Sequence, residues 1–230
     1  MKETHILGVK INSVTMDDAI GFSEDFFNGG VHSVFTPNPE IIMLAQKDKR
    51  LKEILNSADL TLADGIGVVI ASRLLRNPLP ERVAGFDFVC RLFDSGRSFY
   101  LFGAKPGIAE EAAKRLRERG VKVVGTHHGY FEDDGEIIAD INEKKPDILL
   151  VCLGAPKQEK WIADNKDKLS VSLCLGVGGT LDVLSGNAKR APLFFQKCGL
   201  EWLYRAVCQP SRLFRLAALP RFLIYVLRSK

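Results

Sequence analysis

Asp64 lies where a chain of this pattern would be expected to bind an anion. The stretch ADGIGVV (63–69) follows the apolar run LTL and leads into VVIASRLL, the pattern of a strand that turns into a helix. Helix starts of this kind often bind phosphate, which a carboxylate would repel. Asp64 could simply cap its helix. The alternative is a general base for a hydroxyl nucleophile, since a neutral alcohol must lose its proton as it attacks.

Two glycine-containing turns are candidates for holding a diphosphate. GVGGT (176–180) would let backbone N–H groups approach an anion at the start of a helix, and FGAKPG (102–107) is a second strand–turn–helix pattern. Both can equally be tight turns. The dinucleotide fingerprint is incomplete because Leu181 occupies its last glycine position, and no P-loop lysine follows. The candidate diphosphate-binding residues are Gly103, Lys105, Gly176, Gly178, Gly179 and Thr180.

Three further polar motifs are candidates for substrate binding. In TPNPE (36–40), prolines stiffen a turn that carries Thr36 and Asn38, although Asn38 could be only a helix cap. In LGAPKQE (153–159), Gln158 can both donate and accept hydrogen bonds, which suits sugar hydroxyls; it could also be an exposed residue of the helix start. Arg82, in NPLPERVAGFD, is either a solvated charge or a fork for phosphate or carboxylate.

Metal ligands are not evident in the sequence. There is no D-x-D motif, and His127 and His128 lack helical spacing and an acid partner. We therefore expect neither a metal-dependent sugar-nucleotide site nor another cofactor.

The elements that would position these residues alternate between strand and helix. The predicted strands are 4–9, 31–36, 59–63, 98–103, 121–126, 147–153 and 171–177. The predicted helices are 15–28, 39–56 (with a break), 66–75, 86–95, 107–119, 135–144, 156–168 and 180–185. Strands such as DILLVCLG are apolar on both faces, which predicts an α/β fold with a mostly parallel, Rossmann-like sheet between helices. The polar strand ends should then converge on one rim.

The positive charge of the chain lies at its C-terminal end. Residues 196–230 carry a net charge of +6 and residues 1–195 a net charge of −2. This division predicts an α/β domain over 1–195 and a basic appendage over 196–230. The five cysteines form no C-x-x-C and the first residues form no long apolar segment, so we expect a reduced, cytoplasmic protein.

The segment LFRLAALPRFLIYVLRSK (213–230) predicts two short amphipathic helices, which Pro220 should break or kink. Arginines interrupt the segment, so none of its apolar runs is long enough to span a bilayer. Such a segment is suited to the anionic inner surface of the cell membrane. A helix packed on the body, or an oligomer contact, is the alternative. We expect no nucleic-acid partner, and both a monomer and a homo-oligomer stay open.

In combination and in order, the motifs resemble the WecG/TagA/CpsF glycosyltransferases over almost the whole chain, most closely the TagA-type members of wall teichoic acid synthesis. The matching segments are TPNPEIIMLAQ, ADLTLADGIGVV, PLPERVAGFD, YLFGAKPG, PDILLVCLGAPKQEKWI, GVGGTLDVLSGNAKRAP and GLEWLYRAVCQPSRLFR.

The resemblance implies metal-independent, inverting transfer of N-acetylmannosamine from a UDP donor to the 4-hydroxyl of undecaprenyl-diphosphate-linked N-acetylglucosamine. It implies that Asp64 is the base, that Thr36 and Gln158 contact substrate, and that Arg82 contacts phosphate or substrate. Arginines of the appendage, here Arg212, Arg215 and Arg221, would close the site and dock it on the membrane. Family members also use the uronic acid of N-acetylmannosamine, glucose or glucuronic acid, and the sequence leaves this choice open.

Two other classes of protein stay open. A nucleotide-dependent oxidoreductase would need the glycine fingerprint that is incomplete here. A non-catalytic, membrane-associated nucleotide-binding protein would have no use for Asp64.

Overall fold

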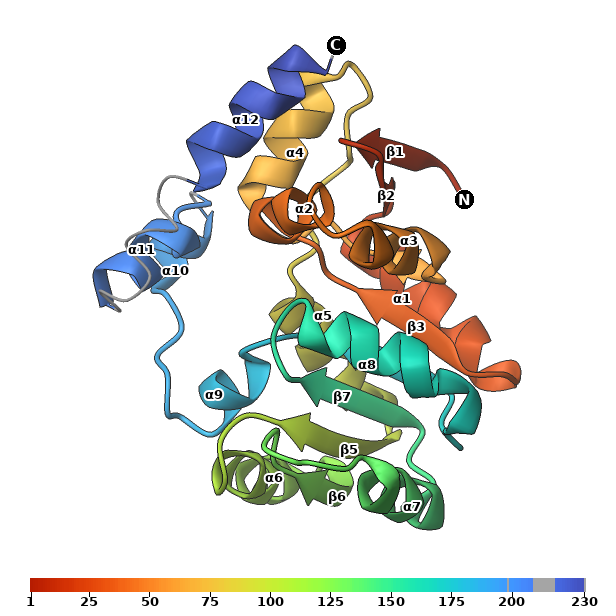
Figure 1. Ribbon diagram of the computed structural model, residues 1–230. Coiled ribbons are helices and arrows are strands. Elements are labelled where there is room, and N and C mark those ends of the chain that lie inside the picture. Colours follow the sequence, from red (N-terminus) through yellow and green to blue (C-terminus); the bar gives the residue numbers. More distant parts are fainter. Residues whose placement is uncertain (198, 209–217, 230) are drawn as a thin grey trace.

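A computed structural model describes residues 1–197, 199–208 and 218–229 (Figure 1). Its centre is a six-stranded sheet in the order β4-β3-β8-β7-β5-β6, in which every neighbouring pair is parallel. The strands are β3 (His32–Phe35), β4 (Leu60–Thr61), β5 (Ser98–Gly103), β6 (Lys122–His127), β7 (Ile148–Cys152) and β8 (Leu173–Gly176). The predicted α/β fold with a parallel sheet is confirmed.

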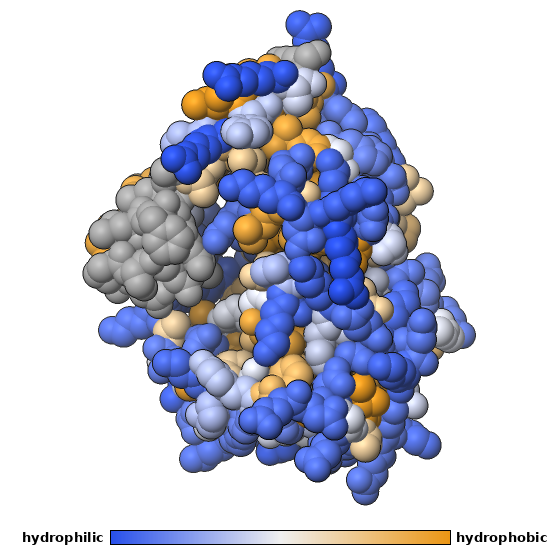
Figure 2. All heavy atoms as spheres, viewed as in Figure 1, coloured by the Kyte–Doolittle hydropathy of each residue, from blue (hydrophilic) through white to orange (hydrophobic). Residues whose placement is uncertain are grey.

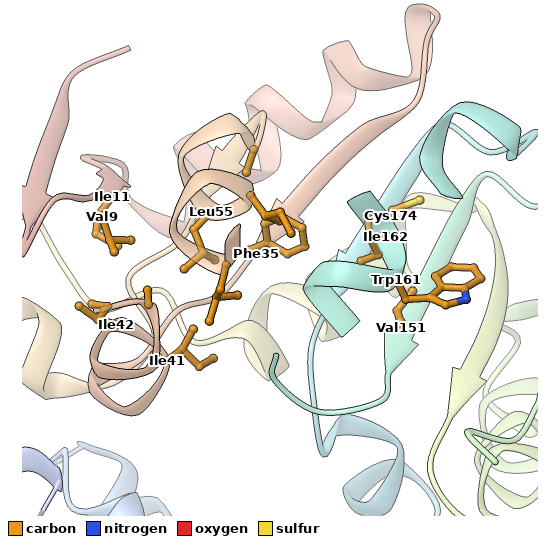
Figure 3. Packing of buried hydrophobic residues seen from close by; sticks show 14 of the residues in the cluster. Val9, Ile11, Phe35, Ile41, Ile42, Leu55, Val151, Trp161, Ile162 and Cys174 are labelled. Atoms are coloured by element: carbon orange, nitrogen blue, oxygen red, sulfur yellow. The ribbon is translucent and has the colours of Figure 1, made fainter. Parts of the chain in front are cut away.

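Helices cover both faces of this sheet because its strands are apolar on both sides. Along β5, Phe99 and Leu101 pack into one buried cluster, and Tyr100 and Phe102 pack into the other. Figure 3 shows part of the second cluster, where Trp161 and neighbouring side chains fill the space between helix and sheet. The helices are α1 (Met16–Asp25), α2 (Pro39–Ala45), α3 (Lys49–Ser57), α4 (Ile66–Leu74), α5 (Gly85–Leu92), α6 (Ile108–Glu118), α7 (Gly135–Lys144), α8 (Lys157–Asn165) and α9 (Thr180–Leu184), with 3₁₀ turns at Phe26–Asn28, Phe93–Ser95 and Lys166–Lys168.

The predicted strand 4–9 is wrong, because the chain reverses inside it. Residues Glu3–Ile6 (β1) and Val9–Asn12 (β2) form an antiparallel hairpin outside the main sheet. Leu7 and Gly8 both have positive φ at the turn, 52° and 75°, as a tight two-residue hairpin loop requires. The apolar pattern conceals this turn because Ile6 and Val9, on either side of it, are both buried.

The predicted break in helix 39–56 is confirmed, since α2 ends at Ala45 and α3 begins at Lys49. Each helix has its own cap: the side chain of Asn38 accepts from the backbone N–H of Ile41, and that of Asp48 accepts from Leu51.

After α9, the described residues form the helices α10 (Leu193–Lys197), α11 (Glu201–Cys208) and α12 (Ala218–Arg228). Helix α10 crosses residue 196, where the appendage was expected to begin, and that domain boundary stays a prediction. Arg212 and Arg215 lie outside the described residues. Pro220 lies in the first turn of α12 as described, where its missing N–H would have no partner within the helix. The expected break at Pro220 stays a prediction, because residues 209–217 lie outside the described residues.

Helix α12 packs against α2 and α4 (Figure 1). Phe222 and Val226 are fully buried at this contact. Gly67, in the first turn of α4, makes the approach close enough: a Cβ there would lie 2.5 Å from Leu219 Cδ1 and 2.6 Å from Pro39 Cγ. Packing on the body therefore accounts for one face of α12.

The opposite face of α12 is apolar and basic. Ile224, Tyr225 and Leu227 are each about half exposed, and Arg221 and Arg228 are exposed beside them. Figure 2 shows hydrophobic and hydrophilic residues side by side on this end of the molecule. Among the described residues, no helix is both long and apolar enough to cross a membrane.

Candidate active site

A cleft of about 420 Å³ lies beyond the carboxyl ends of four strands, β3, β4, β7 and β8. The parallel sheet brings these ends together although their residues are far apart in sequence. Six of the sequence-predicted site residues line the cleft: Thr36, Asn38, Asp64, Gln158, Gly178 and Gly179.

Asp64 is half-buried in the wall of this cleft, between β4 and α4. The cap residue of α4 is Gly65, whose φ of 92° is in the glycine-favoured region, so Asp64 stands one residue before the cap. Asp64 also lines a second, smaller cleft of about 60 Å³, together with Thr36, Arg190 and Glu201. Asp64 thus lies where the two clefts share a wall.

Thr36 and Asn38 follow β3 and have structural partners. The Thr36 hydroxyl donates to the carbonyl oxygen of Gly176 at 3.2 Å, which joins the ends of β3 and β8. Asn38 Oδ1 accepts from the Ile41 N–H at 3.0 Å, so the interpretation of Asn38 as a helix cap is confirmed. Both residues also line the cleft, and their roles toward substrate stay predictions.

Gln158 is only 2% exposed, so its interpretation as an exposed residue of the helix start is wrong. Its Nε2 donates to Glu159 Oε1 at 2.9 Å, and its Oε1 accepts from the backbone N–H of Gly178 at 2.9 Å. The glycine turn is therefore held from inside the protein, and the Gly178 N–H is engaged by Gln158.

The remaining diphosphate candidates are divided between two places. Thr180 is buried and its hydroxyl donates to the Val177 carbonyl at 2.7 Å, while Gly176 ends β8. Gly103 has a φ of 133°, and a Cβ there would lie 2.4 Å from the Cys152 carbonyl oxygen, so close strand packing accounts for this glycine. Lys105 lines a larger cleft.

This larger cleft, of about 720 Å³, lies beyond β5 and β7. Tyr130 contributes an aromatic side chain that is 62% exposed. Lys157 Nζ lies 4.4 Å from the centre of the Phe131 ring and donates to the Gly129 carbonyl oxygen at 3.3 Å, which fixes the loop in the wall. Asp182 lines both this cleft and the 420 Å³ cleft, which makes the two clefts neighbours.

Arg82 contacts α11, one of the C-terminal helices. Its Nη1 lies 2.7 Å from Glu201 Oε2 at the start of α11, and both side chains are mostly buried, 19% and 14% exposed. The guanidinium group of Arg82 therefore binds the Glu201 carboxylate next to the small cleft, and a guanidinium group can bind a phosphate in the same way.

Sequence reasoning missed several side chains of the site. Asp182, Lys189 and Arg190 line the clefts, and Glu159 is buried next to Gln158. Arg190 pairs with Asp87 at 2.5 Å and stacks 4.6 Å from the Phe86 ring. The basic pair in GNAKRAP was the available signal, whereas the position of Asp182 depends on how the two clefts meet.

Comparison with known proteins identifies the family. Residues 4–230 match the family described as "Glycosyl transferase WecG/TagA/CpsF family". The chain belongs to this family. It is similar to an N-acetylglucosaminyldiphosphoundecaprenol N-acetyl-beta-D-mannosaminyltransferase of Bacillus spizizenii, with 36% identity over 203 residues, 86% of this chain and 79% of that protein. It is also similar to the enzyme of the same name from Staphylococcus aureus, with 34% identity over 234 residues, 98% of this chain and 92% of that protein.

As a member of the WecG/TagA/CpsF family, this protein is a glycosyltransferase. The parallel sheet thus positions the clefts of a sugar-transferring enzyme at its carboxyl edge. In the part of the chain that the structure describes, no group of three His, Cys, Asp or Glu side chains is placed to hold a metal ion.

Proposed function

We propose that this glycosyltransferase transfers N-acetylmannosamine from UDP-N-acetylmannosamine to the 4-hydroxyl of undecaprenyl-diphosphate-linked N-acetylglucosamine, with inversion to a β-1,4 linkage. The names of the two relatives support the sugar and the lipid acceptor. The product would serve as the linkage unit of wall teichoic acid.

The observation that carries the proposal is the position of Asp64 in the wall shared by two clefts. Inversion by single displacement requires one base that takes the proton of the acceptor hydroxyl. A half-buried acid in the wall of the 420 Å³ cleft can reach a hydroxyl of an acceptor bound there, while the donor sugar enters from the neighbouring 720 Å³ cleft. Thr36, Asn38 and Gln158 line the same space and would orient the sugars.

The larger cleft is suited to the nucleotide of the donor. Tyr130 offers a ring face for a base, and Lys105 and Lys157 offer cations for phosphates. Asp182, shared with the first cleft, would accept hydrogen bonds from sugar hydroxyls. In metal-independent transfer, cations and N–H groups must stabilise the charge that develops on the departing UDP. Lys189 and Arg190 would help to stabilise this negative charge, as would Arg82, the 176–180 turn and the appendage arginines Arg212, Arg215 and Arg221.

The appendage would bring this site to its lipid-linked acceptor. The exposed apolar and basic face of α12 supports docking on the anionic inner surface of the membrane. An oligomer that uses the same face is the competing arrangement.

The test is release of UDP by the purified protein. We expect UDP release from UDP-N-acetylmannosamine only when a lipid-diphosphate N-acetylglucosamine analogue is present. Asp64→Asn keeps the size of the side chain but cannot accept a proton, so kcat should fall roughly 10²–10⁴-fold. Gln46→Glu, a change on the α2 side away from the cleft wall, is the control. Turnover by Asp64→Asn equal to that of the wild type would refute the role of Asp64 as the general base.

The identity of the donor is tested with a panel of UDP-sugars against one acceptor. The proposed donor is wrong if the enzyme does not use UDP-N-acetylmannosamine but efficiently uses UDP-glucose, UDP-glucuronic acid or the uronic acid of UDP-N-acetylmannosamine. Binding of UDP-sugars without any transfer would instead favour a non-catalytic nucleotide-binding protein.

A further inference from the structure

Glu159 is a buried acid that the proposed chemistry does not use. It lies in the first turn of α8 and is 1% exposed. Its Oε1 accepts from Gln158 Nε2, but among the described residues its Oε2 has no hydrogen-bond partner. An unsatisfied buried carboxyl oxygen destabilises a fold, and the favourable place of an acid in the first turn of α8 only partly offsets this cost.

The surrounding lysines do not account for Glu159 either. Lys157 stacks on Phe131 and donates to the Gly129 carbonyl oxygen, and Lys160 pairs with Asp48 at 2.5 Å. The Glu159 carboxyl instead accepts a hydrogen bond from an amide group, that of Gln158.

The two partners of Gln158 leave its amide only one orientation. A side-chain amide has two N–H donors on nitrogen and two acceptor lone pairs on oxygen. Glu159 takes one of the N–H donors, and the Gly178 N–H takes one lone pair. A flipped amide would turn its NH₂ group toward the Gly178 N–H and its oxygen toward the Glu159 carboxyl oxygen, so both hydrogen bonds would be lost.

The fixed orientation determines what Gln158 presents to the cleft that it lines. One N–H donor and one lone pair are left, which is the combination that a sugar hydroxyl, itself both donor and acceptor, can match.

We propose that Glu159 is a positioning residue, which fixes the amide of Gln158 and, through it, the Gly178 turn, so that Gln158 presents one donor and one acceptor to a sugar hydroxyl in the cleft. This inference rests on the proposed function of the cleft. Glu159, unlike Gln158, does not line the cleft, so it does not itself touch substrate.

The test compares three substitutions within α8. Glu159→Leu removes the acceptor with little change in volume, and Glu159→Gln keeps an acceptor oxygen. Asn165→Leu is the matched control, because Asn165 is also buried in α8 but donates to Asp134 Oδ2 at 2.7 Å, at the other end of the helix. Where Glu159→Leu does not fold, Glu159→Met makes the same comparison.

We expect Glu159→Leu to lower kcat/KM of transfer about tenfold, the worth of one hydrogen bond that holds a substrate-binding group. Glu159→Gln should restore kcat/KM to within about threefold of the wild type, since its oxygen can accept the same bond. Asn165→Leu should lower thermal stability but leave kcat/KM of the folded enzyme unchanged.

A second measurement reports directly on the hydrogen bonding of the Gln158 side-chain amide. The ¹⁵N side-chain NH₂ signals of Gln158, assigned by their loss in Gln158→Leu, should be shifted and exchange faster with solvent in Glu159→Leu but not in Glu159→Gln or Asn165→Leu. Unchanged signals together with unchanged kcat/KM in Glu159→Leu would overturn the inference.

The variant Gln158→Leu separates this inference from the proposed function. If Gln158→Leu impairs transfer while Glu159→Leu behaves like Asn165→Leu, the positioning role is wrong and the cleft keeps its function. If Gln158→Leu transfers at the wild-type rate, Gln158 does not bind substrate, and both the inference and this part of the proposed site are wrong.

Discussion

Glu159 shows at the scale of one residue how burial changes the ionisation of an acid. Desolvation is the main cause that raises the pKa of its carboxyl above the ordinary value of 4.5, and the hydrogen bond from Gln158 only partly opposes it. The folded state therefore binds the proton of this group more tightly than the unfolded state does.

From this shift we predict that Glu159→Gln is stabilising at neutral pH. For a carboxyl whose folded-state pKa is raised, the favourable contribution to stability is present below the unfolded pKa, near 4.5, and is lost as the pH rises through the folded pKa. The free energy of unfolding of Glu159→Gln should exceed that of the wild type at pH 7.5, by about 1.4 kcal/mol for each unit of the shift, and the difference should shrink toward pH 4.5. Urea unfolding across this pH range measures it, and a difference independent of pH would contradict the prediction.

Residue identity alone was enough to select Asp64, Thr36, Asn38 and Gln158, because polar groups at the ends of apolar strands are visible in the sequence. The burial of Gln158 was not visible, since a QE pair at a helix start has the composition of an exposed turn. Its two partners come from the adjacent residue and from a turn 20 residues further along the chain.

At the scale of elements, the ion pair between Arg82 and Glu201 joins the loop before α5 to α11, across 119 residues of sequence. No local pattern could predict this pair, nor the turn at Leu7 and Gly8, because a leucine at positive φ has no sequence signal. The main strands and helices were predictable, since their apolar periodicity continues through whole elements.

This pair allows the contact of Arg82 with α11 to be tested apart from its predicted role toward phosphate. We predict that Arg82→Glu and Glu201→Arg each loosen α11, and that the double charge reversal recovers part of the loss, with a coupling of about 0.5–3 kcal/mol. Hydrogen exchange of the α11 amides measures the contact.

Transfer activity then distinguishes the roles of Arg82. If Arg82 also binds a phosphate, the double reversal should restore protection of α11 but not transfer. Recovery of both would show that Arg82 acts only as an anchor for the helix.

For the whole molecule, α12 presents one face to the body and another to its surroundings. We predict that Ile224→Ser, Tyr225→Ser and Leu227→Ser, combined, lower binding to anionic liposomes about tenfold or more, because apolar area available to the bilayer is lost. Co-sedimentation with phosphatidylglycerol vesicles measures the binding. Phe22→Ser, at a residue of the α1 surface that is 38% exposed, is the matched control.

Two outcomes would count against membrane docking by this face. Equal binding by the triple variant and the wild type would assign the membrane contact elsewhere. A change in molecular mass on sedimentation, without a change in liposome binding, would assign the same face to an oligomer.

Gly67 couples the turn that carries Asp64 to the C-terminal helix α12. It lies three residues after Asp64, and the space left by its missing side chain is filled by Leu219 of α12 and Pro39 of α2. The turn from Asp64 into the first residues of α4 therefore sets two features, the position of Asp64 and the seat of the C-terminal helix. A side chain in place of Gly67 would displace Leu219 of α12 or Pro39 of α2, so a single change next to Asp64 would also move the C-terminal helix.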